Sequence, residues 1–376
     1  MSPRVRIAAA IVLCLPVFAI AQPAGVLRFR TVSIADDPRR IGGEAYRMLV
    51  PFDWRVDANI MWHNSAANTA SPWVKVIGPA RQEIGILPAS TFFWNPRLLG
   101  ANFRPGSFYN GTEVQFPVLD PFQCIDKIVI PRYRRHLDNA TIVKQELLPE
   151  LAAAGRAKYP QPEYRNAVFQ AGRVRFEYVE SGVQMEEDVY VLTVAVQFAS
   201  GQTVSTVWSP DEIRYSKAPT GTLDAQLPLF QTCLFSLRPN LKWFGRVQEM
   251  SQEYSRLQAQ ASSAAVGRAL AQGAIAADRM DAANRSSEQT EQMNATNLKR
   301  YQSRQAVMNN INAHWDVTRQ GELYRDPATG ETVELPSGYG AAWVNLSGEF
   351  LLAVSASFDP DSTSKGSWTR LEKTAP

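Results

Sequence analysis

The stretch "DVYVLTVAVQF", residues Asp188 to Phe198, decides how the chain folds. Valine and other β-branched or aromatic side chains dominate it, and no glycine or proline interrupts it. Such a run is typical of a β-strand. It stands between two similar runs, "RVRFEYVE" (173–180) and "TVSTVWS" (203–209). Together these three runs predict one group of strands.

A second group of predicted strands lies nearer the N-terminus, where short β-rich runs are separated by proline, glycine and asparagine. We expect them to pair in antiparallel fashion. These runs are "VLRFRTVSI", "YRMLVP", "WRVDANIMW", "WVKVIGP" and "QEIGILP".

Helical segments are predicted between the two groups and after them. In "PFQCIDKIVIPRYRR" (121–135) apolar side chains recur at helical spacing, and we expect Pro131 to end the helix. "TIVKQELLPELAAAG" (141–155) is expected to be partly helical. A further helix is indicated by Leu223, Leu227, Phe230 and Leu234, which share one face. Strands in two groups with helices between and after them indicate an α+β fold.

Beyond Pro239 the composition changes. A heptad seam is formed by Trp243, Val247, Met250, Tyr254, Leu257 and Ala261. An alanine-rich portion follows, and an apolar stripe returns before Trp315. The pattern predicts a long helix or a helical hairpin, and it leaves open whether 262–295 is helical or a disordered polar linker.

The C-terminal stretch "YRDPATGETVELPSGYGAAWVN" (324–345) alternates turns with short strands. The Asp-Pro-Ala-Thr-Gly run provides the residues that a tight turn requires. We expect a small β-meander, whose aromatic side chains either form a mini-core or face a ligand. The candidate partner-binding residues here are Tyr324, Tyr339 and Trp343.

The order of these features resembles a group of uncharacterised exported bacterial proteins, and its front part resembles the PsbP-like fold. The resemblance is carried by Pro51 to Trp54 at the start of the sheet and by Ser236 and Asn240 after the closing helix. It implies an antiparallel sheet covered by helices and a protein that binds partners or assists assembly. The segment 95–164 departs from the pattern and is expected to be an insertion.

The N-terminus has the pattern of a secretory signal peptide. Arg4 and Arg6 precede the apolar run Ile7 to Ile20, and a small-x-small site ends at Ala21. An uncleaved anchor is the alternative, although the run is short for a membrane span. We expect a periplasmic or secreted protein without a transmembrane span. The formal charge of +3 includes the two arginines of the leader. Such a near-neutral balance argues against a nucleic-acid binder.

Convergent catalytic groups are scarce in the sequence. His63, His136 and His314 are isolated, and neither zinc-ligand spacing nor a nucleophile or phosphate-binding motif occurs. We therefore expect no catalytic residue, no metal site and no cofactor. Three consecutive acids, 186–188, can be interpreted as a cation chelate or as a solvated turn, and the latter is favoured. The residues around Asp359 could also bind calcium through their oxygen atoms, but the sequence supports this interpretation more weakly.

The densest basic run, "PRYRRH" (131–136), contributes the candidate partner-binding residues Arg132, Arg134 and Arg135. In an exported protein they could contact anionic lipid or an acidic partner. The alternative, which we favour, is a solvated helix end whose arginines complement the helix dipole.

Cys124 and Cys233 follow the expected leader, and both stand among apolar residues. They could pair if the insertion packs over the closing helix. We expect two unpaired, buried thiols instead.

We divide the chain into a signal peptide (1–21), an α+β domain (22–238), a helical arm (239–318) and a β-module (319–376). The 9 tryptophans, 12 tyrosines and 17 phenylalanines favour an exported, non-enzymatic protein that binds a protein or envelope component or assists assembly. The alternatives are a glycan- or peptide-directed hydrolase that uses paired carboxylates and self-association through residues 240–318.

Overall fold

The computed structural model describes most of the chain. The described ranges are 25–63, 68–96, 104–109, 112–157, 159, 164–200, 203–271, 321–362 and 366–374. The expected signal peptide and the second half of the expected helical arm lie outside them.

The expected fold class, a PsbP-like antiparallel sheet covered by helices and followed by a long helix or helical hairpin, is wrong. Strands make up 49% of the described residues and helices only 23%, and the main element is a curled mixed sheet. The described residues contain no helical hairpin. The sequence misleads because charged residues occur inside the strands. The strand that contains the run 203–209 continues through polar and charged residues to Pro219.

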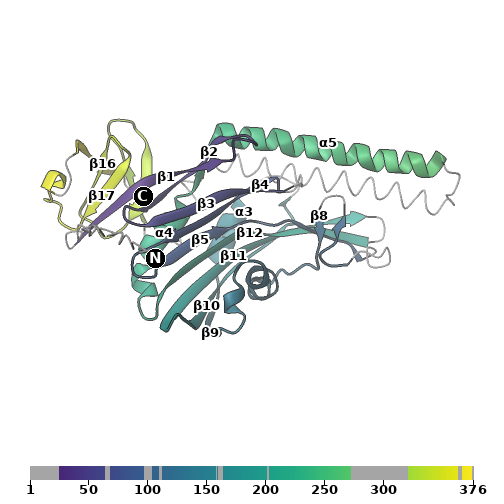
Figure 1. The fold of residues 1–376 in the computed structure, drawn as a ribbon, viewed down its shortest axis with the longest axis horizontal. Coiled ribbons are helices and arrows are strands. Elements are labelled where there is room, and N and C mark those ends of the chain that lie inside the picture. The colour runs from purple at the N-terminus through teal and green to yellow at the C-terminus, as the bar shows by residue number, and fades with distance from the viewer. Residues whose placement is uncertain are drawn as a thin grey trace, which may run out of the picture.

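The large sheet is built around three long neighbouring strands, which include the three runs described first (Figure 1). Its order is β3 (Arg55–Trp62), β4 (Ala70–Ile77), β5 (Glu83–Leu87), β12 (Thr203–Pro219), β11 (Val183–Ser200), β10 (Val168–Glu180) and β9 (Thr141–Leu147). Three short strands extend it beside β12, namely β6 (Phe92–Trp94), β7 (Phe108–Tyr109) and β8 (Thr112–Val114). Its ladders are antiparallel except that between β6 and β8.

The second sheet joins the two ends of the chain. Its order is β13 (Arg238–Pro239), β2 (Gly43–Pro51), β1 (Val26–Asp36), β17 (Glu349–Ala353), β16 (Ala341–Asn345) and β18 (Trp368–Arg370). Phe29 of β1 lies opposite Phe350 of β17. A three-stranded sheet contains β15 (Thr332–Pro336), β14 (Gly321–Arg325) and β19 (Glu372–Lys373). The C-terminal strands occur where the sequence predicts them, but they are divided: β16, β17 and β18 extend the sheet formed by the first strands, and β14 and β15 belong to the separate three-stranded sheet.

A short helical segment covers one face of the large sheet. It comprises α1 (Pro121–Cys124), the π-helical turn η2 (Ile125–Val129), α2 (Ile130–Tyr133) and the 3₁₀ turn η3 (Arg135–Leu137). The expectation that Pro131 ends the helix is wrong. The Ile130 N–H donates to the Ile125 carbonyl, five residues back. The π turn thus precedes Pro131, whose missing N–H is tolerated in the first turn of α2.

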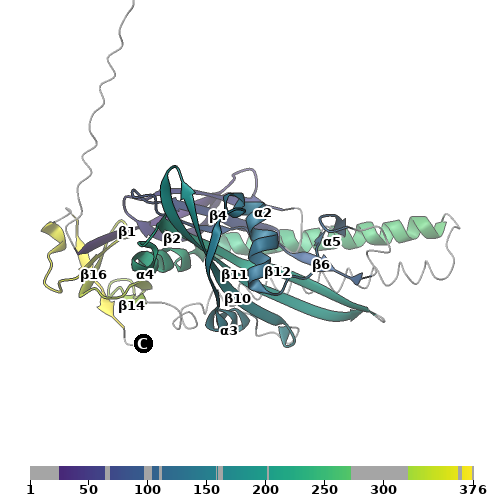
Figure 2. The ribbon, with the colours of Figure 1, turned by 90° about the horizontal axis from the view of Figure 1, so that it is seen from below.

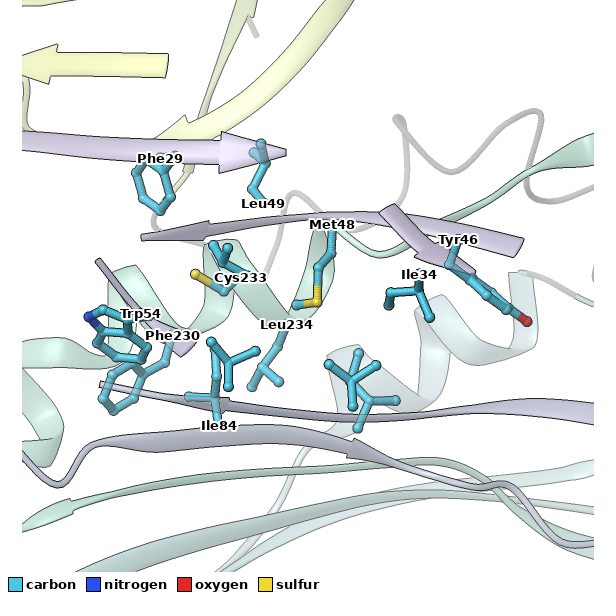
Figure 3. Close-up of a cluster of buried hydrophobic side chains, with 14 of the residues drawn as sticks. Phe29, Ile34, Tyr46, Met48, Leu49, Trp54, Ile84, Phe230, Cys233 and Leu234 are labelled. Carbon is cyan, nitrogen blue, oxygen red and sulfur yellow. The ribbon is translucent and has the colours of Figure 1, made fainter. Parts of the chain in front are cut away.

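Two further helices lie against the other face. Gly155 of α3 (Pro149–Ala157) sits against Leu192 of β11. α4 (Leu223–Phe235) lies between the C-terminal strands and the large sheet (Figure 2). The predicted apolar helix is confirmed, and Phe230, Cys233 and Leu234 contribute to the core between the two sheets (Figure 3).

The helix α5 (Leu241–Ala271) follows at once and begins over β2 in Figure 1. Trp243 and Val247 of the predicted seam are buried, whereas Leu257 is exposed. The first turns are fixed by Asp36, which accepts hydrogen bonds from the indole N–H groups of Trp62 and Trp243. The first residues of the predicted seam therefore pack against other parts of the same chain. The remaining element is the 3₁₀ turn η6 (Pro360–Ser362).

Candidate functional site

Two consecutive acids of β11, Glu187 and Asp188, are both fully buried. The expectation of a solvated turn is therefore wrong for them. The chelate interpretation also fails, because successive side chains of a strand point to opposite faces of the sheet. Each carboxylate instead meets arginine on its own face. Glu187 lies beneath the α1–α2 segment, and Asp188 lies on the face of α4.

On the first face Glu187 accepts two hydrogen bonds from Arg134, both 2.7 Å long. Arg134 also donates to Glu83 of β5 at 3.3 Å. The hydroxyl of Tyr178 donates to Glu187, and His136 Nε2 lies 3.1 Å from the same carboxylate. One arginine thus bridges two strands that are not neighbours in the sheet.

Tyr215 fixes the position of Arg134. Its ring carries the Arg134 guanidinium on one face, 3.8 Å from the ring centroid. Its hydroxyl donates to Glu83. The ring passes over Gly85, where an added Cβ would lie 2.3 Å from a ring carbon. A side chain at Gly85 would therefore displace the tyrosine.

Positive and negative charges balance in this cluster. Lys75 and Lys217 lie 3.1 and 3.4 Å from Glu83, and Lys217 also contacts Glu180. Burial alone would raise the pKa of Glu187, but the His136 hydrogen bond and the charge of Arg134 lower it to about 2. We call these residues the Glu187 cluster, namely Lys75, Glu83, Arg134, His136, Tyr178, Glu180, Glu187, Tyr215 and Lys217. Its members satisfy one another, which is the pattern of a structural ion cluster.

On the opposite face, polar side chains form two adjacent rows across the strands. One row comprises Glu146, Arg173, Tyr190 and Arg214. The next comprises Lys144, Arg175, Asp188 and Ser216. Asp188 receives two hydrogen bonds of 2.8 Å from Arg175, and Arg173 contacts it at 3.3 Å. Asp188 thus contacts two arginines, of which Arg173 also pairs with Glu146 and Arg175 also pairs with Asp224.

A cavity of about 160 Å³ lies between these rows and α4. We call it the α4 cavity. Its polar side is lined by Glu146, Arg173, Tyr190, Arg214 and Ser216. Its other side is lined by Leu148, Leu151, Leu227, Phe230, Gln231, Leu234 and Phe235. Apart from Gln231, the side of the cavity away from the strands is thus apolar.

Two arginines, Arg173 and Arg214, lie on the polar side of the α4 cavity. Arg214 donates to Glu212 and to the Leu234 carbonyl, and its guanidinium lies over the Phe235 ring. Burial nevertheless lowers the pKa of Arg214 to about 9. Arg173 Nε and Ser216 Oγ are buried without a well-formed hydrogen bond to the described residues, although Ser216 and Arg173 both lie close to the Tyr190 hydroxyl. An anionic group would complement this side of the cavity.

The candidate residues of the C-terminal stretch do not form one exposed face. Trp343 is buried with Leu351 and Ala353, and Tyr324 is buried in the main core. Tyr339 is partly buried against the main core. Trp343 and Tyr324 therefore act as core residues, as the mini-core interpretation expects, but in two separate clusters. They are not available as anchors for a partner.

The three candidate arginines are also separated. Arg134 is buried in the Glu187 cluster, so the solvated-helix-end interpretation is wrong for it. Arg132 donates to Glu113 and lies over the ring of Phe92. Arg135 is exposed and donates to the Pro131 carbonyl. Of these three candidates, Arg135 alone is exposed without a carboxylate partner among the ion pairs of the described residues.

Both cysteines are free and buried, as expected. Cys124 belongs to the core under the α1–α2 segment, and Cys233 to the core between the sheets. They are separated because the α1–α2 segment and α4 cover opposite faces of the large sheet. Among the described residues, no three His, Cys, Asp or Glu side chains gather as a metal site. The same part of the chain contains no helix both long and apolar enough to span a membrane.

Comparisons with protein-family models, curated proteins and solved structures find no match to this chain. The resemblance to PsbP-like proteins gains no support from them.

Sequence reasoning did not identify the α4 cavity or the Glu187 cluster. The available signal was Arg173 and Arg175 alternating with Val174 and Phe176 in a strand otherwise rich in apolar residues. Arginines at every second position of a long central strand indicate a charged face, and that face must be buried when a helix covers it. The acids that pair with them follow in the next strand.

Proposed function

We propose that this chain is an exported, non-enzymatic binding protein of the bacterial cell envelope. We propose further that it holds a small anionic molecule with a compact apolar body in the α4 cavity. The observation that supports the proposal is the composition of this cavity. Arg173, Arg214 and Ser216 line one side, and leucine and phenylalanine side chains line the other. Ligand pockets commonly combine an apolar wall with a few polar groups that fix orientation.

The volume of the cavity restricts the ligand. A cavity of roughly 150 Å³ lined by apolar side chains binds benzene. The α4 cavity has about 160 Å³. The ligand is therefore one ring or a short branched chain that carries a carboxylate or a similar anion. Benzoate has this size and charge and is the probe for the first test.

Binding is favoured over hydrolysis because the buried carboxylates are held in ion pairs. Glu83 and Glu187 meet through Arg134, which brings two carboxylates near each other. Both have a lowered pKa, and neither lines the α4 cavity. A general acid requires a raised pKa and access to the substrate. Export is proposed from the leader pattern of Arg4, Arg6 and residues 7–20.

The test is a calorimetric titration of the chain from Gln22 onward with benzoate. In the Leu227→Phe variant the larger side chain fills part of the α4 cavity, so we expect benzoate to bind at least about tenfold more weakly, roughly 1.4 kcal/mol. Leu229→Phe is the matched control, because Leu229 lies on the same helix but packs against the core between the sheets. This control should bind benzoate as the unchanged protein does.

Two further ligands separate charge from shape. Benzyl alcohol keeps the ring and lacks the anion, and acetate keeps the anion and lacks the ring. Both should bind more weakly than benzoate. Equal binding of benzoate to the Leu227→Phe and Leu229→Phe variants, or no binding to any of the proteins, would refute the proposal.

A further inference from the structure

A second hollow lies on the other side of Phe235, the last residue of α4. We call it the Arg238 groove. It occupies about 390 Å³ where β1 and β2, the end of α4 and β15 meet. Its polar lining comprises Thr31, Arg47, Ser236, Arg238, Glu331 and Glu334. Met48, Phe235 and Phe350 provide apolar surface. The groove is thus more polar and larger than the α4 cavity, and it shares only Phe235 with it.

One wall carries two arginines at directly opposed positions. Arg238 of β13 lies opposite Arg47 of β2 in antiparallel register, so both side chains are on the same face of the sheet. Like charges at opposed positions destabilise a sheet unless something between them compensates. Arg47 contacts Glu44, and Arg238 donates to the carbonyls of Phe235 and Leu237. Arg238 thus has backbone partners but no carboxylate in the ion pairs of the described residues.

Arg238 is also affected by a third arginine. Burial lowers the pKa of Arg238 to about 10, and the charge of Arg214 contributes to the decrease. The cost of holding these cations close together would fall if an anion bound beside them. Arg47 is the accessible member, since 65% of its side chain is exposed.

The facing wall has the opposite charge. Glu331 and Glu334 flank Thr332 and Val333 at the start of β15. Glu331 is exposed, and its backbone carbonyl accepts from Asp326, which closes the preceding turn. The groove thus offers cations on the sheet side and carboxylates on the β15 side. A ligand that spans it needs an anion at one end and a cation at the other.

We propose that the Arg238 groove binds the zwitterionic backbone of a short peptide or free amino acid. The ligand carboxylate lies beside Arg47 and Arg238, and its ammonium group lies beside Glu331 and Glu334. The apolar surface of Met48 and Phe350 accepts small side chains. This site is independent of the α4 cavity and of its proposed ligand.

The test is a titration of the chain from Gln22 onward with L-alanyl-L-alanine, its N-acetyl form, its C-terminal amide and free L-alanine. We expect the dipeptide to bind, and we expect each blocked form to bind at least about tenfold more weakly, because a charge-assisted contact is lost. Free alanine tests whether the backbone of one residue is sufficient. If neither the dipeptide nor free alanine binds, the proposal is overturned.

Two variants then test which wall of the groove contacts the carboxylate end of the ligand and which contacts its ammonium end. In Arg47→Met the amide and the free dipeptide should approach each other in affinity, because one of the two partners of the carboxylate is gone. In Glu331→Gln the N-acetyl form and the free dipeptide should approach each other in affinity. Arg55→Met and Glu372→Gln remove exposed charges outside the groove and serve as controls. A general structural effect would weaken all four ligands equally and would contradict the assignment.

The Leu227→Phe variant distinguishes this proposal from the preceding one. It should lose benzoate binding and keep dipeptide binding. Loss of both would show that the two hollows are not separate sites and would overturn the independent site proposed here.

Discussion

The two faces of the large sheet accommodate a buried carboxylate in different ways. Glu187 and Asp188 are neighbours in β11, both are fully buried, and both pair with arginine. Under the α1–α2 segment every charge of the Glu187 cluster meets its complement. On the α4 face, Asp188 holds Arg173 and Arg175, while the α4 cavity remains beside them. One face is therefore closed by its ion pairs, and the other keeps space beside its cations.

This difference follows from what covers each face. The α1–α2 segment contributes Arg134, a side chain that reaches two carboxylates at once. Beside the cavity, α4 contributes leucine and phenylalanine side chains, which cannot pair with arginine. Asp224, in the first turn of the same helix, pairs with Arg175. Arg214 instead donates to the carbonyl of Leu234 near the end of α4. At the cavity, α4 therefore offers apolar side chains and a backbone carbonyl, and the space beside Arg173 and Arg214 is where we propose that an anionic ligand binds.

The largest effect is expected from breaking the closed face. Arg134→Met removes the partner of two buried carboxylates, and losing one member of a buried ion pair costs roughly 3–5 kcal/mol. Urea unfolding measures this loss. Arg132→Met is the control, because the ion pair of Arg132 with Glu113 is partly exposed and should contribute at most about 1 kcal/mol. Similar losses for the two variants would show that the Glu187 cluster is no more important than a surface pair.

The response to acid tests the same cluster. The pKa of Glu187 is about 2 in the folded protein, against an ordinary value of 4.5. A lowered folded pKa stabilises the protein above pH 4.5, and this contribution is lost as the pH falls toward 2. The gap in free energy of unfolding between the unchanged protein and Glu187→Gln should therefore shrink from pH 5 to pH 2.5. Glu186→Gln, the neighbouring change, is the control for the substitution itself, and a constant gap for Glu187→Gln would contradict the account.

Gly85→Ala perturbs the closed face without removing a charge. The new methyl group would meet the Tyr215 ring and push it away from Glu83 and Arg134. Overpacking of this kind costs about 1–3 kcal/mol. Gly245→Ala in α5 is the matched control, because an added Cβ there has no neighbour within 4 Å. This control should stabilise the protein by roughly 0.5–1 kcal/mol. The two variants should therefore change the free energy of unfolding in opposite directions, as measured by thermal or urea unfolding.

The reactivity of the two cysteine thiols shows whether both faces of the large sheet stay packed. Burial raises the pKa of Cys124 to about 12, and it also raises that of Cys233. At pH 8 only about one in 10,000 Cys124 thiols is then ionised, and the thiolate is the reactive form. The native chain from Gln22 onward should resist a thiol reagent, and both thiols should react in urea. Rapid labelling of the native protein, or a non-reducing mass two hydrogens lighter, would contradict this packing.

The sequence predicts the local elements better than their partners. The run Asp188 to Phe198 is a strand as expected, and the helix that contains Phe230 forms where the apolar face indicates. The pairing of β1 with β17 is not predictable, because it joins residues more than 300 positions apart through backbone hydrogen bonds that leave no pattern in either strand.

The candidate sites were harder to predict because charged side chains usually indicate solvent. Arg134 reads as part of a basic surface run, and Glu187 reads as part of an acidic turn. In the fold the two are buried together and pair with each other. Tyr324 and Trp343 could be interpreted in two ways, because aromatic side chains suit both a buried core and a binding interface. Burial of these residues depends on contacts between distant segments, which local spacing does not encode.

A crystal structure of the chain from Gln22 onward with benzoate tests the central claim most directly. The account predicts density for benzoate between α4 and the large sheet. The carboxylate should lie within hydrogen-bond distance of Arg173, Arg214 or Ser216, and the ring should lie against Phe230 or Leu234. The Glu187 cluster should contain no ligand in the same crystal. An α4 cavity without benzoate at saturating concentration, or benzoate bound under the α1–α2 segment instead, would contradict the distinction between a closed and an open face.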